Sequence, residues 1–574
     1  MRILNKYLKK YYPRMALGFS IKSIGTLSEL MLPYILSHIL TNVLGKNVGE
    51  IIMWGGLMVL FSAIACSFNI VANRMAAKVS RNFAEALRRD LFYKTLHLSA
   101  RQTDKFTIPS LESRITTDTY NVHHFVNMIQ RLGVRAPMLL IGGIAVTLVM
   151  DAYLSLVMIS MLPLMFIVVY FISRKGVPLY TKVQKRVDSM VRVVREDAHG
   201  IRVIKALSKT DYENRRFDKV NRELVGEETK SGVIMGSVNP IMTLFMNMGS
   251  VAVIAIGAHR VTGSLSSAET VIAFMQYFTL ISNAMMSVTR MFVMYTKSAA
   301  SARRISEVLY TEEEQRVEAK EKFPDIKTDA HIKFDKVCFS YNGKRNNLTN
   351  IDFEIKKGES LGIIGATGAG KSTIVKLLLR FYDANSGGIY INGEDIRTVE
   401  KSRLYEMFGS ALQHDFLYAD TIEENIRFGR NAVSHDDVER ATKTAQAEEF
   451  IKAFPEGYEH VLSQHGTNIS GGQKQRLLIS RAICTKPDIL ILDDSSSALD
   501  YKTDAALRRA LKEQMAGTTV VTVAQRVSSI KDCELIIVLD EGRIIGMGDH
   551  SCLMENCSEY NEIALSQMGG AFVD

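Results

Sequence analysis

The first half of the chain alternates long apolar stretches with charged connectors. Six apolar stretches cover residues 15–40, 51–72, 132–150, 153–172, 234–258 and 270–295. Each is close to the roughly 20 residues with which a helix crosses about 30 Å of hydrocarbon. Beyond residue 330, short aliphatic runs alternate with amphipathic helical stretches, which is typical of an α/β domain. The pattern therefore predicts six membrane helices followed by a soluble α/β domain.

A charged, apolar-poor segment separates these two parts. It reads "TEEEQRVEAKEKFPDIKTDA" over residues 311–330 and is interpreted as a linker. We expect an α-helical transmembrane domain over residues 1–310, with two long cytoplasmic connectors, and an α/β domain over residues 331–574. The first residues, "MRILNKYLKKYYPR", mix basic and apolar side chains. They predict an amphipathic helix on the inner membrane surface rather than a signal peptide.

The distribution of charge gives the orientation of the helices. The connectors over residues 74–131 and 174–230 hold ten and fifteen lysines and arginines, whereas the other three hold only Lys46 and Arg260. This is the positive-inside bias, and it places both termini and the α/β domain in the cytoplasm of a multi-pass protein of the cell (plasma) membrane. The net charge of +9 therefore reflects membrane orientation, and nucleic acid is excluded as a partner. The six scattered cysteines predict reduced thiols rather than a disulfide framework.

The clearest chemical motif is "LGIIGATGAGKST" over residues 361–373, a G-x-x-x-x-G-K-S sequence between an aliphatic strand and a helical run. Glycines let the backbone N–H groups face phosphates, the lysine reaches the outer phosphates and the serine hydroxyl binds Mg²⁺. The strand in "ILILDD" would bring Asp493 to the same site, where it holds Mg²⁺ through water. The motif thus predicts a nucleotide, bound through its phosphates, and Mg²⁺ as cofactors. Its predicted binding residues are Gly365, Gly368, Gly370, Lys371, Ser372 and Thr373.

A second predicted anion-binding surface lies about a hundred residues later, in "NISGGQKQR". Its serine hydroxyl and glycine N–H groups would stand at the start of a helix, where the backbone carries positive potential. The residues concerned are Ser470, Gly471, Gly472 and Gln473.

In this order and spacing the motifs resemble those of the ATP-binding cassette (ABC) family, and nearly the whole chain resembles its exporters with six membrane helices ahead of one cassette. The resemblance implies that Tyr341 in "VCFSY" stacks on adenine. It also implies that Gln413 in "SALQHDF" lies near Mg²⁺ and signals to the membrane domain, and that Asp500 in "SALD" forms the aspartate loop. The connector tips near "DKFTIPSLESR" and "REDAHGIRVIKA" would be coupling helices. In this family each ATP lies between the phosphate cradle of one chain and the S-G-G-Q turn of another.

Two residues depart from the family pattern beside the same γ-phosphate. Asp494 stands where the family has a glutamate that polarises water, and Gln525 stands where it has a histidine. The aspartate stops one methylene short, about 1.5 Å, and a misplacement of about 1 Å can cost on the order of a hundredfold in rate. With Gln413 these residues form the predicted catalytic set, and Ser372, Gln413 and Asp493 form the metal set.

The departures predict a site that binds ATP and hardly hydrolyses it, as in the degenerate-site subunit of bacterial heterodimeric multidrug transporters. The partner would be a second half-transporter; a heterodimer is preferred and a homodimer is possible. The alternative is a conservative change with activity retained.

Polar residues at helical intervals on three apolar stretches predict a substrate pathway, because charges at membrane depth usually face water or a partner charge. Helix packing is one alternative, and an ion pair between Glu29 and Arg290 is another. Methionines and aromatic residues nearby favour amphiphilic or lipophilic, multidrug-type cargo. The pathway candidates are Lys22, Glu29, Asn239, Asn247, Gln276, Asn283 and Arg290.

These observations together predict an ATP-driven exporter half. Peptide or lipid export is the alternative within transport, and an ATP-gated regulatory or sensor subunit without transport is the alternative outside it.

Overall fold

The computed structural model describes residues 2–44, 48–312, 314–413 and 415–568. Its contacts divide the chain into two compact units. The helical unit comprises Met1–Leu96 and Thr107–Thr311, and the α/β unit comprises His97–Phe106 and Glu312–Asp574.

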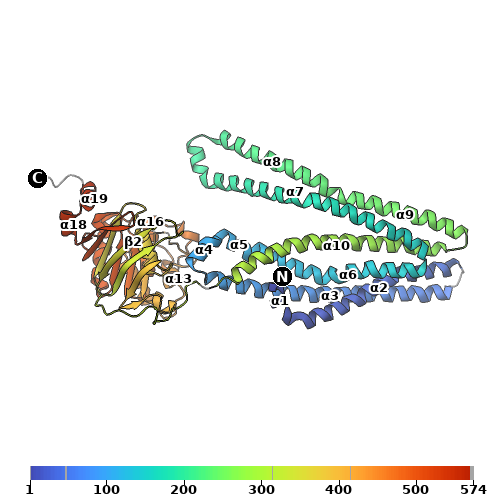
Figure 1. The fold of residues 1–574 in the computed structure, drawn as a ribbon, viewed down its shortest axis with the longest axis horizontal. Coiled ribbons are helices and arrows are strands. Elements are labelled where there is room, and N and C mark those ends of the chain that lie inside the picture. The colour runs from blue at the N-terminus through green and yellow to red at the C-terminus, as the bar shows by residue number, and fades with distance from the viewer. Residues whose placement is uncertain (1, 45–47, 313, 414, 569–574) are drawn as a thin grey trace. The chain divides into compact units, whose positions relative to one another are not determined.

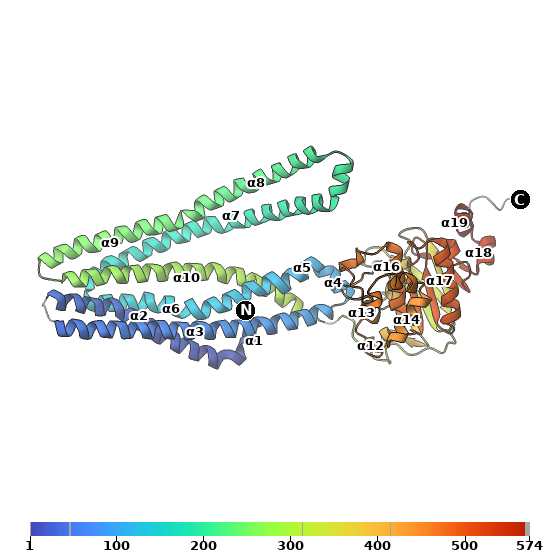
Figure 2. The ribbon, with the colours of Figure 1, turned by 180° about the vertical axis from the view of Figure 1, so that it is seen from behind.

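The helical unit consists of long helices joined by short turns (Figure 1). In both views α7 and α8 run side by side (Figure 2). The elements are α1 Arg2–Leu8, a 3₁₀ turn Lys9–Tyr11, α2 Tyr12–Leu44, α3 Val48–Leu96, α5 Ile108–Ser113, a π-helical turn Arg114–Asp118, α6 Thr119–Met150, α7 Ala152–Ala206, α8 Thr210–Gly236, α9 Val238–Thr262 and α10 Ala268–Leu309.

Five of the six predicted stretches lie in helical segments that are long and apolar enough to cross a membrane. Within the described residues these segments are Val48–Leu96, Ile108–Met150, Ala152–Ala206, Thr210–Thr262 and Ala268–Leu309. The first predicted stretch also forms a continuous helix, α2, but this helix carries Lys22 and Glu29 and is not one of the five. Lys46, one of the two basic residues of the outer connectors, lies outside the described residues.

The inner connectors are continuations of the membrane helices. The 55 residues of α7 extend over about 80 Å at 1.5 Å per residue, far more than a bilayer requires. The chain turns back between α7 and α8, just beyond the second predicted tip. At the first tip the helix breaks at Thr107, whose φ is 63°.

Close backbone approaches fix the packing of the helices. A Cβ atom on Gly249 of α9 would lie 2.4 Å from the Phe278 ring of α10, so only glycine permits this contact. Tyr277 of α10 is fully buried, and its hydroxyl donates to the Leu30 carbonyl of α2 at 2.6 Å. At the N-terminus, Leu4 and Tyr7 of α1 are buried, and Tyr7 donates to Asp90 of α3 at 2.9 Å. The predicted N-terminal helix is therefore present, with part of its apolar face covered by protein.

The α/β unit contains a four-stranded antiparallel sheet, β2-β1-β4-β5, and a six-stranded sheet, β10-β9-β3-β8-β7-β6. In the second sheet only the β9–β10 pair is antiparallel. The strands are β1 Ile332–Phe339, β2 Leu348–Ile355, β3 Ser360–Gly365, β4 Ser386–Ile391, β5 Glu394–Asp395, β6 Phe408–Ala411, β7 Ile489–Asp493, β8 Thr519–Val523, β9 Leu535–Asp540 and β10 Arg543–Gly548.

Helices flank these sheets, as the α/β prediction requires. They are α4 Ala100–Phe106, α11 Lys371–Leu378, α12 Lys401–Glu406, α13 Ile422–Arg427, α14 His435–Thr444, α15 Glu448–Lys452, α16 Gly471–Ile483, α17 Tyr501–Gln514, α18 His550–Asn556 and α19 Ser558–Met568. Helix α4 comes from the first predicted connector tip, yet its contacts are with this unit. The Tyr382 hydroxyl donates to Asp104 at 2.5 Å, and the Gln102 amide donates to the Glu312 carbonyl at 2.6 Å.

A buried arginine joins the predicted linker to the α/β unit. The side chain of Arg380 is 1% exposed and pairs with Asp383 at 3.0 Å. It also donates to the carbonyls of Arg316 at 2.9 Å and Ile396 at 3.0 Å. A buried guanidinium with all of these partners holds the linker against the sheet.

We expect Arg380→Met to destabilise the α/β unit by about 3 kcal/mol, because a carboxylate and two carbonyls lose a buried donor. Calorimetric unfolding of the purified chain measures this loss. Arg403→Met is the matched control, since Arg403 is 62% exposed and its ion pair is a surface one. Equal shifts in the two variants would contradict the assigned role.

Candidate functional site

A pocket of about 200 Å³ lies where four adjacent parallel strands end. Strands β3, β8, β7 and β6 are neighbours in this order, so the segments that follow them meet at one edge of the sheet. The pocket is lined by Asn347, Thr367, Gly368, Gly370, Lys371, Ser372, Thr373, Gln413, Asp493, Asp494, Val523, Ala524 and Gln525.

The loop after β3 has the conformation that a phosphate cradle needs. Gly365 has a φ of 152°, and a Cβ atom there would lie 2.0 Å from the Leu539 carbonyl oxygen. Gly370 has a φ of 106°, in the left-handed region that favours glycine. The Lys371 ammonium donates to the Gly365 and Ala366 carbonyls at 2.8 and 2.9 Å. Burial lowers the pKa of this ammonium, and the Asp494 and Asp493 carboxylates oppose that effect.

The predicted magnesium residues lie together. The Ser372 hydroxyl donates to Asp493 at 3.3 Å, and Gln413 lines the same pocket. Burial raises the pKa of the Asp493 carboxyl, while the hydrogen bond from Ser372 lowers it. Among the described residues no cluster of three or more His, Cys, Asp or Glu could hold a metal by itself. One hydroxyl and one carboxylate suit Mg²⁺, which usually completes its shell with water and substrate phosphates.

Asp494 has an unusual backbone and two amide partners. Its φ is 51°, and its Oδ2 accepts hydrogen bonds from Gln413 at 3.2 Å and from Gln525 at 3.1 Å. Burial raises the pKa of this carboxyl, and the Gln413 hydrogen bond and the Lys371 charge oppose it. The two residues that depart from the family pattern therefore contact each other directly.

The predicted adenine, aspartate-loop and S-G-G-Q residues are placed without lining the pocket. Tyr341 lies beside the phosphate loop's helix, where its hydroxyl donates to Thr373 at 3.3 Å. Asp500 is the N-cap of α17 and accepts from the Thr503 N–H at 2.9 Å. Ser470 is the N-cap of α16 in a capping box with Gln473, with hydrogen bonds of 3.2 and 2.9 Å. The S-G-G-Q turn is thus preformed at a helix start, apart from the pocket of its own chain.

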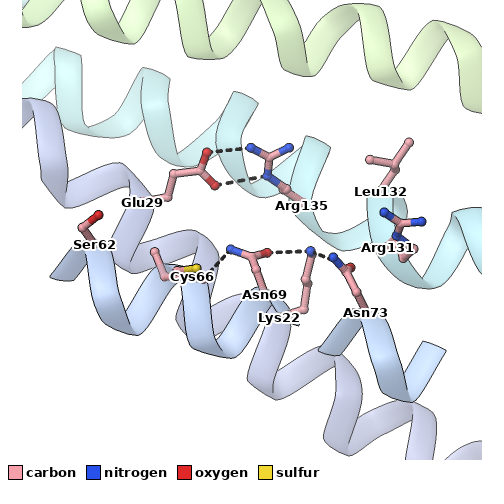
Figure 3. Close-up of a pocket in the computed structure, with 10 residues that line it drawn as sticks. Lys22, Glu29, Ser62, Cys66, Asn69, Asn73, Arg131, Leu132 and Arg135 are labelled. Carbon is pink, nitrogen blue, oxygen red and sulfur yellow. Dashed lines mark hydrogen bonds and ion pairs between the residues drawn. The ribbon is translucent and has the colours of Figure 1, made fainter. Parts of the chain in front are cut away.

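The predicted pathway residues fall into two groups. Lys22 and Glu29 line a pocket between α2, α3 and α6 (Figure 3). Glu29 pairs there with Arg135 at 2.6 Å, so the alternative in which Glu29 pairs with Arg290 is wrong. The remaining candidates are exposed on α9 and α10, namely Asn239, Asn247, Gln276, Asn283 and Arg290.

Sequence reasoning missed several polar residues of these two pockets. Asn69 and Asn73 on α3, and Arg131 and Arg135 on α6, contribute to the membrane pocket. Each pair has the i, i+4 spacing that places two side chains on one helix face, which was the available signal. Asn347, immediately before β2, lines the phosphate pocket without any motif to mark it.

Comparisons with known proteins cover both units. Residues 15–285 match the family model described as the ABC transporter transmembrane region, and residues 348–497 match the one described as ABC transporter. The chain is 32% identical over 565 residues to the uncharacterized ABC transporter ATP-binding protein YfiB of Bacillus subtilis (strain 168), with 98% of each chain covered. It is 30% identical to the uncharacterized ABC transporter ATP-binding protein Rv1273c of Mycobacterium tuberculosis (strain ATCC 25618 / H37Rv), over 100% of this chain and 99% of the relative.

A solved structure shares the fold over the same length. It is that of a bacterial Atm1-family ABC exporter with ATP bound, with a TM-score of 0.82 and 23% identity. The likeness covers 98% of this chain and 99% of the other. The predicted fold class, a helical exporter domain followed by a P-loop α/β domain, is confirmed.

We expect Lys371→Ala to weaken ATP binding about a hundredfold, because the ammonium's charged hydrogen bonds to the phosphates are lost. Titration of the purified chain with a fluorescent ATP analogue measures this change. Lys357→Ala is the control, since Lys357 lies on the exposed turn before β3. Unchanged affinity in the Lys371 variant would contradict the assignment of the cradle.

Proposed function

Because the chain belongs to the ABC transporter family, with the membrane and ATP-binding domains of an exporter in one polypeptide, we propose that it exports amphiphilic or lipophilic compounds as one half of a heterodimer. ATP-driven export is the activity of the family. The pairing, the division of labour between the two ATP sites and the cargo class are the proposed parts.

The observation that carries the proposal is the set of contacts around Asp494. Its carboxylate is one methylene shorter than that of glutamate and accepts two amide hydrogen bonds. A water-polarising base must reach the attacking water, and a shortfall of about 1 Å costs on the order of a hundredfold. The raised pKa of Asp494 is compatible both with a general base and with a residue that takes no part in catalysis. The length of the side chain therefore decides whether Asp494 can polarise the attacking water.

Gln525 supports the same division of labour. Its amide donates to Asp494 at 3.1 Å, but an amide carries no positive charge. Charge stabilisation of the transferring phosphoryl group is usually the largest catalytic contribution at such sites. Since the cradle itself is intact, the site is proposed to hold ATP with Mg²⁺ bound by Ser372 and Asp493, and to hydrolyse it slowly.

The S-G-G-Q turn supports the choice of a different partner chain. Its capping box is intact, and the first N–H groups of α16 are available for phosphate. In the family arrangement this turn completes the partner's site. A partner with the catalytic glutamate and histidine would therefore hydrolyse ATP at that site. The cradle of this chain would bind its own ATP and hydrolyse it only slowly.

Helix α10 supports amphiphilic cargo. One side of it carries Gln276, Asn283 and Arg290, which are exposed and lie at intervals of seven. Phe292 and Tyr295 are exposed on other sides of the same helix. The Arg290 guanidinium donates to Ser287 at 3.3 Å. In contrast, Tyr277, Phe278 and Met285 are buried in the bundle, where they serve packing. The exposed surface of α10 thus includes both polar and aromatic groups, which suits molecules with both kinds of surface.

We expect the chain purified alone to hydrolyse ATP slowly and the double variant Asp494→Glu, Gln525→His to be about a hundredfold faster. Two copies of this chain supply every other part of an ATP site, including the S-G-G-Q turn. The variant therefore restores only the length of the acid at position 494 and the positive charge at position 525. Steady-state ATPase in nanodiscs is the measurement, with Asp494→Asn as the slow control. Rapid hydrolysis by the unmodified chain would contradict the proposal that its site binds ATP without hydrolysing it efficiently.

In the complex with a partner chain, we expect Ser470→Ala to lower ATPase about tenfold or more, because a hydroxyl that contacts phosphate is lost. Ser434→Ala is the matched control. Ser434 caps α14 of the same unit through the same kind of capping box, so both variants lose the same helix cap. Equal effects in the two variants would show that only the cap matters.

A further inference from the structure

A second pocket, of about 400 Å³, lies within the helical unit between α2, α3 and α6 (Figure 3). Its charged residues are Lys22, Glu29, Arg131 and Arg135, so the lining carries a net charge of two positive. The volume is that of a small-ligand site. Uncompensated positive charge among membrane helices is costly, and an anion in the pocket removes this cost.

Lys22 is held in place with one donor left over. It is 3% exposed, and its ammonium donates to Asn69 at 2.6 Å and to Asn73 at 3.1 Å. Both asparagines belong to α3, so Lys22 is oriented from one side of the pocket (Figure 3). An ammonium has three donors, and the third remains for an acceptor in the pocket.

The two arginines of α6 differ in their partners. Arg135 forms a bidentate pair with Glu29, with distances of 2.6 and 3.1 Å, so its charge is locally compensated. Arg131, one turn earlier, has no hydrogen bond or ion pair within the described part of the chain. It is exposed and lines the same pocket. Arg131 and Lys22 thus offer unused donors from two helices.

The depth of the pocket indicates where an anion would come from. Arg131 immediately precedes the apolar stretch over residues 132–150, whose 19 residues span about 28 Å as a helix. That length is close to the hydrocarbon thickness, so Arg131 lies at its cytoplasmic border, where lipid headgroups are found. Apolar Ala65 and Leu132 line the pocket beside the charges.

We propose that this pocket binds the phosphate-bearing headgroup of an anionic amphiphile from the cytoplasmic leaflet, with Arg131 and Lys22 as its ligands. Arginine's planar fork matches phosphate oxygens, and basic pockets between helices on the cytoplasmic side suit such headgroups. The proposal deepens the proposed export by giving the amphiphile a charge. Binding is measured without ATP, so its failure is distinct from failure of the export proposal.

The chain carries its own probe for the test. Cys66 is exposed and lines the pocket, whereas Cys552 is exposed on α18 of the other unit and serves as an internal control. The full chain is placed in phosphatidylcholine nanodiscs with and without phosphatidylglycerol, and maleimide labelling of each thiol is followed by peptide mass spectrometry. We expect phosphatidylglycerol to slow labelling at Cys66 only. Native mass spectrometry of retained phosphatidylglycerol gives a second readout independent of the thiol.

Two matched variants separate the pocket from general surface charge. Arg131→Gln should raise the phosphatidylglycerol needed for half protection about tenfold, because one charged hydrogen-bonding group is lost. Arg74→Gln is the control, since Arg74 is an exposed arginine on α3 that does not line the pocket. Equal effects of the two variants would overturn the proposal. So would an unmodified chain in which phosphatidylglycerol neither protects Cys66 nor is retained. Protection by inorganic phosphate in phosphatidylcholine nanodiscs, without any by phosphatidylglycerol, would overturn the lipid source.

Discussion

The arrangement of the nucleotide site depends on the parallel pairing of β3, β8, β7 and β6. Buried aliphatic side chains hold these strands together, and parallel pairing sends all four carboxyl ends to one edge. The phosphate loop, Gln525 and Gln413 each follow one of these strands, and the two aspartates lie at the end of β7. A shift of one residue in β7 would turn Asp493 away from Ser372, because neighbouring side chains on a strand point to opposite faces.

Much of this site was predictable from sequence because its motifs are local. The strand, glycine loop and helix over residues 361–373 identify the phosphate cradle, and "ILILDD" identifies Asp493, the predicted metal-binding aspartate. The contacts of Asp494 were not predictable, because Gln413 lies 81 residues before it and Gln525 lies 31 residues after it. Their meeting is a consequence of strand order, which no local pattern encodes. The sequence identifies Asp494 and Gln525 as the unusual residues, but only the fold shows that they are hydrogen-bonded to each other.

In the membrane-spanning part, the sequence predicted which polar residues matter but not which residues they contact. A polar residue on an apolar helix attracts attention, but its partner can lie on any neighbouring helix. Glu29 meets Arg135, which is 106 residues away, and Lys22 meets two asparagines of α3. These contacts form a charged pocket between α2, α3 and α6, whereas the polar candidates of α10 are exposed on a different helix.

The left-handed backbone conformation at Asp494 favours aspartate over glutamate at this position. Short polar residues such as aspartate tolerate this conformation better than longer ones, and an unsuited side chain pays on the order of 1 kcal/mol. Shortening the acid therefore relaxes the main chain, whereas lengthening it again adds strain. Any gain in turnover from a longer acid at this position would therefore be accompanied by a loss of conformational stability of this size.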